Sequence, residues 1–235
     1  MRTDMVLPAL FCLAWSFPVL AQEAAPAASR AAPPPAFLDL RGQQPIAGDA
    51  HAGAGKVTVC AACHGQQGTA VVPALANLGG QPATYLYVQL KAFKGGERTD
   101  AVMNGQAALL SDADMRDIAA YFAGFPPAIH GGGDDGSAGA RLYRDGDPAR
   151  GIPPCQGCHG ADGLGPRPEK RQAPQPPWST FPHLAGQSVT FMTKALGDYR
   201  SGARAGTSNA RIMQGVAQAL TDEDIQALGA YLSSR

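Results

Sequence analysis

The sequence has few aromatic residues and no excess of either charge. Phe, Trp and Tyr make up 7% of its 235 residues, and its 19 Lys and Arg balance its 19 Asp and Glu. A formal charge of zero gives no broad basic field for binding nucleic acid. The 29 Gly and 20 Pro leave little side-chain volume for hydrophobic cores. If the chain forms two small domains, each would therefore need another apolar component to complete its core.

Cysteine is scarce as well, and four of the five cysteines lie in two short motifs. CAACHG occupies residues 60–65 and CQGCHG residues 155–160, whereas Cys12 lies in an apolar N-terminal run, Met5–Leu20. Together with the Val-Leu-Ala cleavage pattern at residues 19–21, this run predicts a signal peptide over residues 1–21, whose cleavage removes Cys12. An uncleaved membrane anchor is the alternative, although two prolines and an aspartate weaken it. We therefore expect the mature protein in an oxidising compartment, the bacterial periplasm.

Changes in composition divide the rest of the chain. Residues 22–47 are rich in Ala and Pro, which predicts a flexible tether. Residues 131–139 are rich in Gly and Asp, which predicts a linker. Two domains are therefore expected, over residues 48–130 and 140–235.

Three segments recur in both domains in the same order. The pairs are VCAACHGQQG (59–68) with PCQGCHGADG (154–163), LGGQPATYLYVQLKAFKGGER (78–98) with LAGQSVTFMTKALGDYRSGAR (184–204), and VMNGQAALLSDADMRDIAAYFA (102–123) with IMQGVAQALTDEDIQALGAYLS (212–233). The offsets of 95, 106 and 110 indicate a tandem duplication with residues added to the second copy.

Apolar spacing within the repeat predicts helices and an all-α fold. Leu86, Leu90 and Phe93 follow the i, i+4, i+7 spacing of one helical face, and the second copy repeats it. Short helices are also expected over residues 50–59 and 140–145, each running into a Cys motif.

The last helix of each copy begins at a capping-box pattern, Ser111 with Asp114 and Thr221 with Asp224. Small residues within these helices would allow another helix to cross closely. They are Ala119 and its counterpart Gly229.

Two thiols three positions apart and an adjacent imidazole are typical of covalent c-type haem attachment. Thioethers to two haems would form through Cys60, Cys63, Cys155 and Cys158. His64 and His159 are placed to bind the two irons. A zinc site of four thiols would leave both histidines unexplained, a thioredoxin-like pair needs a βαβ context that is missing, and disulfides within each motif would constrain little chain.

The repeat also indicates which methionines could bind the irons on the face opposite the histidines. His/Met ligation is common in electron-transfer cytochromes, and Met103 aligns with Met213. Met115 and Met192 align with Ile225 and Leu86, which cannot bind iron, and are expected in the core. Core packing is the alternative for Met103 and Met213 as well. The remaining histidines lack a partner histidine in the repeat and are expected at the surface, at positions His51, His130 and His183.

These features resemble the dihaem cytochrome c4 family, which has two class I cytochrome c domains in tandem. The resemblance covers about residues 48–235 and rests on GDAHAGAGKVTVCAACHG, QLKAFKGGERTD, MNGQAALLSDADMRDIAAYFA and GDPARGIPPCQGCHG. It implies two cytochrome c-like domains, each a small helical unit wrapped around a covalent haem. It further implies a pseudo-twofold arrangement with the haems close to the domain interface.

The resemblance also implies roles for individual residues. The iron ligands would be His64 with Met103 and His159 with Met213. A backbone carbonyl in the family holds the Nδ1–H of the haem-binding histidine, and the matching positions here are Ala76 and Pro182.

By this resemblance, the protein would be a periplasmic one-electron carrier with no catalytic residue. Its donor would be a cytochrome bc-type complex or a dehydrogenase, and its acceptor a haem-copper terminal oxidase. Peripheral association with a membrane is compatible with this role, whereas nucleic acid is not an expected partner. Two alternatives are a small dihaem oxidoreductase such as a thiosulfate dehydrogenase, and a permanent cytochrome subunit of a larger dehydrogenase.

The second copy contains 11 added residues within a Pro-rich stretch at residues 163–184, which predicts an extended surface loop. Arg167, Lys170 and Arg171 in this loop could orient an acidic redox partner. A spacer that shields the second haem edge is the alternative.

Overall fold

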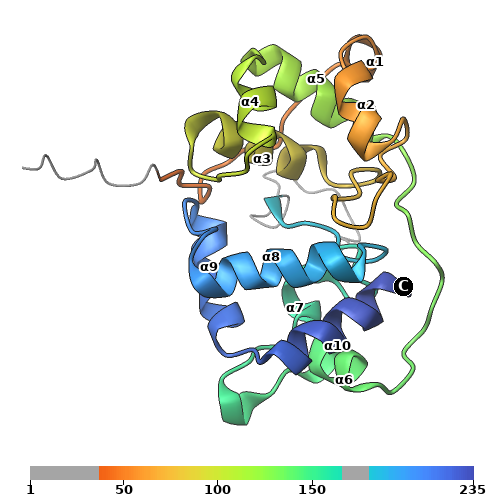
Figure 1. Ribbon diagram of the computed structural model, residues 1–235, viewed down its shortest axis with the longest axis vertical. Coiled ribbons are helices and arrows are strands. Elements are labelled where there is room, and N and C mark those ends of the chain that lie inside the picture. Colours follow the sequence, from red (N-terminus) through yellow and green to blue (C-terminus); the bar gives the residue numbers. More distant parts are fainter. Residues whose placement is uncertain (1–36, 166–179) are drawn as a thin grey trace, which may run out of the picture. The chain divides into compact units, whose positions relative to one another are not determined.

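The computed structural model describes residues 37–165 and 180–235, and helices account for the regular structure in these ranges apart from two isolated β-bridges (Figure 1). The first domain contains α1 (Ala50–Ala54), α2 (Thr58–His64), α3 (Ala83–Gly95), α4 (Met103–Ala108) and α5 (Asp112–Ala123). The second contains α6 (Ala138–Asp145), the 3-10 turn η1 (Pro148–Arg150), α7 (Gln156–His159), α8 (Val189–Ser201), α9 (Ser208–Gln218) and α10 (Asp222–Ser233).

The helices of the two domains correspond in the way that the sequence repeat predicts. In the first domain α1 and α3 pack against α5, and in the second α6 and α8 pack against α10. Both predicted capping boxes are present at the starts of α5 and α10. The single helix expected over residues 50–59 is wrong, because a turn separates α1 from α2 and places the Val57 side chain in the core, where it is 2% exposed.

Glycine allows the closest helix approach in each domain. A Cβ on Gly53 of α1 would lie 2.2 Å from the Asp117 carbonyl oxygen of α5. A Cβ on Gly139 of α6 would lie 2.1 Å from the Ala227 carbonyl oxygen of α10. A Cβ on Gly229 of α10, which the sequence analysis singled out as small, would lie 3.3 Å from the Val189 side chain of α8. This approach is wider than the other two. The tightest contact therefore lies between the first and last helices of each domain.

The chain before α1 is not a free tether over its described part. The Leu38 N–H donates to the Gly206 carbonyl at 2.8 Å, so this segment pairs with the second domain. Leu40 is 3% exposed and packs in the core of the first domain. Ile46 donates its N–H to the Thr84 hydroxyl of α3. The prediction of a flexible tether is therefore wrong for residues 37–47, where apolar side chains and backbone pairing fix the chain.

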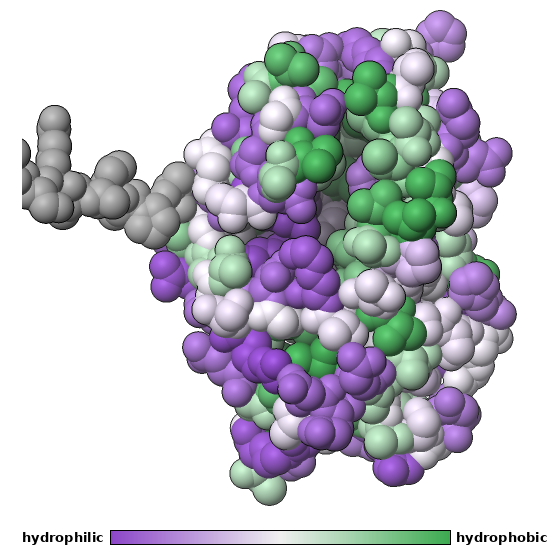
Figure 2. All heavy atoms as spheres, in the orientation of Figure 1, coloured by the Kyte–Doolittle hydropathy of each residue, from purple (hydrophilic) through white to green (hydrophobic). Residues whose placement is uncertain are grey.

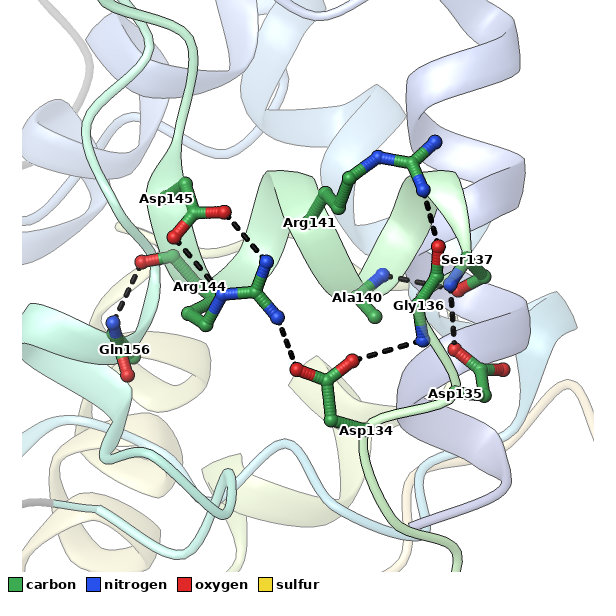
Figure 3. Close-up of polar contacts among 9 residues, drawn as sticks. All are labelled: Asp134, Asp135, Gly136, Ser137, Ala140, Arg141, Arg144, Asp145 and Gln156. Carbon is green, nitrogen blue, oxygen red and sulfur yellow. Dashed lines mark hydrogen bonds and ion pairs between the residues drawn. The ribbon is translucent and has the colours of Figure 1, made fainter.

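The Gly-rich linker is fixed by polar contacts to α6 (Figure 3). Asp134 forms an ion pair with Arg144 of α6. The hydroxyl of Ser137 caps this helix by accepting a hydrogen bond from the Ala140 N–H at 3.1 Å. The last two residues of the predicted linker, 138 and 139, belong to α6. The linker is thus a specific connection that ends in a helix cap.

Two glutamines at equivalent repeat positions connect the domains. The Gln81 side chain donates to the His183 carbonyl at 2.8 Å and accepts from the His183 N–H at 2.9 Å. The Gln187 side chain donates to the Asn77 carbonyl at 2.7 Å and accepts from the Asn77 N–H at 3.0 Å. Both side chains are 4% exposed. Because each glutamine binds the backbone of the other domain, the contact has the reciprocal form of a pseudo-twofold interface.

Several sequence predictions fall on residues outside the described ranges. The predicted signal peptide lies there, as do residues 22–36 of the tether and most of the Pro-rich loop with Arg167, Lys170 and Arg171. Within residues 37–165 and 180–235, no helix has the length and apolar character needed to cross a membrane.

The close approach of α6 and α10 gives a prediction for stability. We expect Gly139→Ala to lower the free energy of unfolding by about 2 kcal/mol or more, because the new methyl group would displace α6 from α10. Urea unfolding of the holoprotein measures this change. Gly215→Ala in α9 is the control, since its Cβ would meet nothing within 4 Å; it should raise stability by up to about 1 kcal/mol. Equal losses in both variants would contradict the packing described here.

Candidate functional site

Each Cys-x-x-Cys-His motif lies on a short helix, the first on α2 and the second on α7. The four cysteines are free, and one thiol of each motif, Cys63 or Cys158, is exposed. Free thiols do not support the alternative of a disulfide within each motif. Among the described residues, no group of three or more Cys, His, Asp or Glu is arranged to hold a metal ion. A zinc site that pools the four thiols therefore has no support.

The histidine of each motif is oriented by a backbone carbonyl. The His64 Nδ1 lies 2.9 Å from the Ala76 carbonyl oxygen, and the His159 Nδ1 lies 2.9 Å from that of Pro182. A carbonyl oxygen can only accept, so Nδ1 carries the proton in both rings. The lone pair is then on Nε2, which is the arrangement that a metal-binding histidine needs. The structure thus shows both of the carbonyl contacts that the family resemblance implied.

Burial keeps these rings neutral. It lowers the pKa of His64 and of His159 from the usual value, and the bond to the carbonyl offsets only part of this effect. In the first domain the nearby Asp100 carboxylate also offsets part of it. A neutral imidazole with a free Nε2 is therefore favoured at neutral pH.

A cavity beside α7 brings the predicted residues of the second domain together. It encloses about 850 Å³ of space, a figure that includes the solvent at its open mouth. Its lining includes Cys155, Cys158, His159, Phe181, Pro182 and Met213. The histidine and the predicted methionine thus line one cavity together with both thiols, as a haem held by all four side chains requires.

In the first domain, Met103 is the first residue of α4 and is half-buried. The Asp100 carboxylate accepts hydrogen bonds from the backbone N–H groups of Val102 and Met103, each at 3.0 Å. The same carboxylate is near enough to His64 to raise the pKa of that ring. No described contact joins Met103 to His64 directly.

Apolar side chains are exposed around the first Cys motif. Figure 2 shows hydrophobic side chains beside a hollow in the upper part of the molecule, where the first domain lies in Figure 1. Val59 precedes Cys60 and is 63% exposed, and Val102 precedes Met103 and is 62% exposed. Val71, which is 60% exposed, donates its N–H to the Cys63 carbonyl. The first site therefore has an apolar rim that is open to solvent.

The other methionines and histidines lie mostly where the repeat predicted. Met115 and Met192 are 4% and 5% exposed within the two hydrophobic cores. His51 and His130 are exposed. The surface prediction is wrong for His183, which is half-buried because the backbone of this residue binds Gln81 of the first domain.

Comparisons with known proteins agree with this geometry. A family model for cytochrome c matches residues 50–124 and 137–235. Cytochrome c4 of Pseudomonas aeruginosa is 40% identical over 83% of this chain and 92% of that protein. The crystal structure of reduced cytochrome c4 from Pseudomonas stutzeri aligns with a TM-score of 0.71 and 37% identity, over 80% of this chain and 99% of that chain. This chain belongs to the dihaem cytochrome c4 family.

Membership confirms the predicted fold class and cofactor. The chain consists of two cytochrome c domains and carries two covalently bound haem c groups. Like other members of the cytochrome c4 family, it is an electron-transfer protein and not an enzyme. A further relative, the thiosulfate dehydrogenase electron acceptor of Stutzerimonas stutzeri, is 34% identical over 74% of this chain and 78% of that protein.

Two arginines that line the second cavity were not singled out from the sequence, and Arg204 is buried while Arg98 is half-buried. Arg98 and Arg204 occupy equivalent repeat positions, and both line the cavity that contains Cys155. Their guanidinium groups both donate to the Gln89 side-chain oxygen, at 2.6 and 2.8 Å. Within the described chain, none of the ion pairs includes either arginine.

The pairing of these cations suits the carboxylates of a haem. Burial lowers the pKa of Arg98 to about 10, and the neighbouring Arg204 adds to this effect. Glu97 lines the same cavity, but one of its carboxylate oxygens is buried without a hydrogen-bond partner in the described structure. A buried cation needs an anionic partner. Haem carries two carboxylates on the edge opposite its vinyl groups, so the lining residues fit this group.

Covalent attachment can be tested separately at each motif. We expect the mass of the denatured wild type to include two haems, which remain after acid-acetone extraction because thioethers are stable to acid. Replacing Cys60 and Cys63 together by Ala should remove one haem mass, and replacing Cys155 and Cys158 should do the same. Retention of both haems in either double variant would contradict the assignment of the motifs.

Proposed function

We propose that this cytochrome is a periplasmic carrier of single electrons between membrane-bound or soluble redox enzymes. The donor is a cytochrome bc-type complex or a dehydrogenase, and the acceptor is a haem-copper terminal oxidase. The haem groups supply the ferric/ferrous couples. An exported location is supported by the apolar run at Met5–Leu20 and its small-residue cleavage pattern.

In this proposal, four side chains bind the irons and four attach the haems. The iron ligands are His64 with Met103 and His159 with Met213. The thioethers form at Cys60, Cys63, Cys155 and Cys158. The observation that carries this proposal is the second cavity, where His159, Met213 and both thiols line one space. The sequence repeat extends the same set to the first domain.

The residues around the second iron site favour electron transfer over substrate chemistry. His159 is held neutral by burial and fixed by the Pro182 carbonyl, so it is set to bind metal and not to move protons. With His159 and Met213 both holding the iron, the haem would have no coordination position left for a substrate. A fixed ligand set also changes little between oxidation states, which keeps the reorganisation on electron transfer small.

A second candidate role is acceptance of electrons from thiosulfate dehydrogenase. It is favoured by the similarity to a protein that bears the name of this role. In that case the donor is the dehydrogenase, and the present chain still carries electrons without acting on thiosulfate. Permanent association with such an enzyme would make the chain a cytochrome subunit, and copurification distinguishes a subunit from a free carrier.

The proposed methionine ligands can be tested against the buried ones. Met103→Ala and Met213→Ala should each remove part of the far-red band that arises from sulfur bound to ferric iron. Each should also lower the potential of its own haem, because a thioether favours ferrous iron. Met115→Leu and Met192→Leu are the controls and should leave the band intact, since apolar swaps of similar size are usually tolerated in cores. Loss of the band in a control would show that the ligands are wrongly assigned.

The carrier function is tested with partners in stopped-flow experiments. The reduced protein should be reoxidised rapidly by membranes that contain a haem-copper oxidase, and the oxidised protein should be reduced by quinol together with a cytochrome bc-type complex. Reduction by thiosulfate dehydrogenase with thiosulfate, but not by the quinol system, would favour the second candidate role. Steady turnover of thiosulfate by the protein alone would contradict both roles.

A further inference from the structure

The reciprocal glutamine contact reaches the histidines of the two haem motifs. The Asn77 N–H, which donates to Gln187, belongs to the same peptide group as the Ala76 carbonyl. That carbonyl accepts the hydrogen bond of the His64 Nδ1–H at 2.9 Å. One peptide group therefore links a histidine of the first domain to a glutamine of the second.

The second domain contains the same connection in the opposite direction. The His159 Nδ1–H donates to the Pro182 carbonyl at 2.9 Å. The N–H of the same peptide group belongs to His183 and donates to the Gln81 side-chain oxygen at 2.9 Å. The glutamine of the first domain thus stands at the end of the hydrogen-bond chain that begins at the histidine of the second domain.

Such a series of hydrogen bonds affects the electron donation of the histidine as well as the domain interface. A peptide group whose N–H donates a hydrogen bond is polarised, and its carbonyl becomes a stronger acceptor. A stronger bond at Nδ1 fixes the ring and makes the other nitrogen a better electron donor to a metal. Hydrogen bonding around axial ligands is one of the means by which a protein sets a haem potential.

Both glutamines are themselves held in place. Gly80 and Gly186, which precede them, have φ values of 71° and 72°. Their N–H groups donate to the Phe122 and Leu232 carbonyls at the ends of α5 and α10, at 3.1 and 2.9 Å. The turn before each glutamine is therefore anchored to the last helix of its own domain, which directs the side chain towards the other domain.

We propose that Gln187 is a positioning residue for His64, and Gln81 for His159, so that each domain adjusts the haem potential of the other. This inference rests on the proposed ligation of the two irons by these histidines. The relay takes no part in electron transfer itself. It sets how strongly each histidine stabilises ferric iron, and it makes each potential depend on the docking of the two domains.

The crossed connection gives a decisive pair of variants, Gln187→Met and Gln81→Met. Methionine has a similar length and shape but cannot accept the backbone N–H. In Gln187→Met we expect the ferrous-to-ferric ratio of the first haem to rise about threefold at a fixed potential, or roughly 30 mV at 59 mV per tenfold change. The second haem should not change. Gln81→Met should show the converse, and each variant is the control for the other.

The potential of each haem is followed through its own methyl signals in a redox titration monitored by NMR. The histidine is observed directly in the ferrous protein with ¹⁵N-labelled histidine. In Gln187→Met the His64 Nδ1–H signal should move upfield and exchange faster, while that of His159 stays in place. If both potentials stay unchanged, or if each variant shifts the haem of its own domain, the relay is refuted.

Failure of the proposed ligation would look different. A wild type without two attached haems, or without the far-red sulfur band, would refute the ligand assignment before any glutamine is changed. If the Met variants do not mature, Gln187→Leu removes the same acceptor with a smaller side chain. The His64 Nδ1–H signal should again move upfield, and the His159 signal should not move. A shift of the His159 signal alone would overturn the proposal.

Discussion

The hydrogen bond from each motif histidine to a backbone carbonyl is the constraint on which the two sites depend. Burial removes the charge from the ring, and the carbonyl fixes the proton on Nδ1. Both effects leave Nε2 available for a metal. The carbonyls lie in the segments that lead to Gly80 and Gly186, and these turns bind the last helix of each domain. The chemistry of the ring is thus connected to the packing of the whole domain.

Duplication made it possible to choose candidate site residues from one sequence. A second copy acts as an internal comparison, and it separated Met103 and Met213 from Met115 and Met192, which are buried in the cores. The capping boxes were predictable because their contacts span only three residues. The helix over residues 50–59 was not, because burial of Val57 in the core imposes the turn that interrupts it.

Features that depend on contact between the copies could not be predicted in this way. The repeat shows that Gln81 and Gln187 are equivalent, but not that each binds the other domain. Leu38 lies in an Ala/Pro-rich segment, and its backbone pairing with Gly206 bridges residues far apart in the sequence. Arg98 resembles any charged residue after a helix, although its side chain lines the cavity of the second domain. The glutamine contacts, the Leu38 pairing and the position of Arg98 all depend on contact between the two domains.

These contacts make the two domains less independent than a tandem repeat suggests. Arg98 comes from the first domain and lines the cavity that contains the second motif. In the N-terminal segment, Leu38 pairs with the second domain, and Leu40, two residues further on, packs in the core of the first. A small domain with a weak core gains from such shared burial. It follows that separating the domains would remove the contact of buried Arg204 with Gln89 and the hydrogen bonds next to both histidines. The dihaem unit, and not the single domain, is therefore the unit on which the properties of either iron site depend.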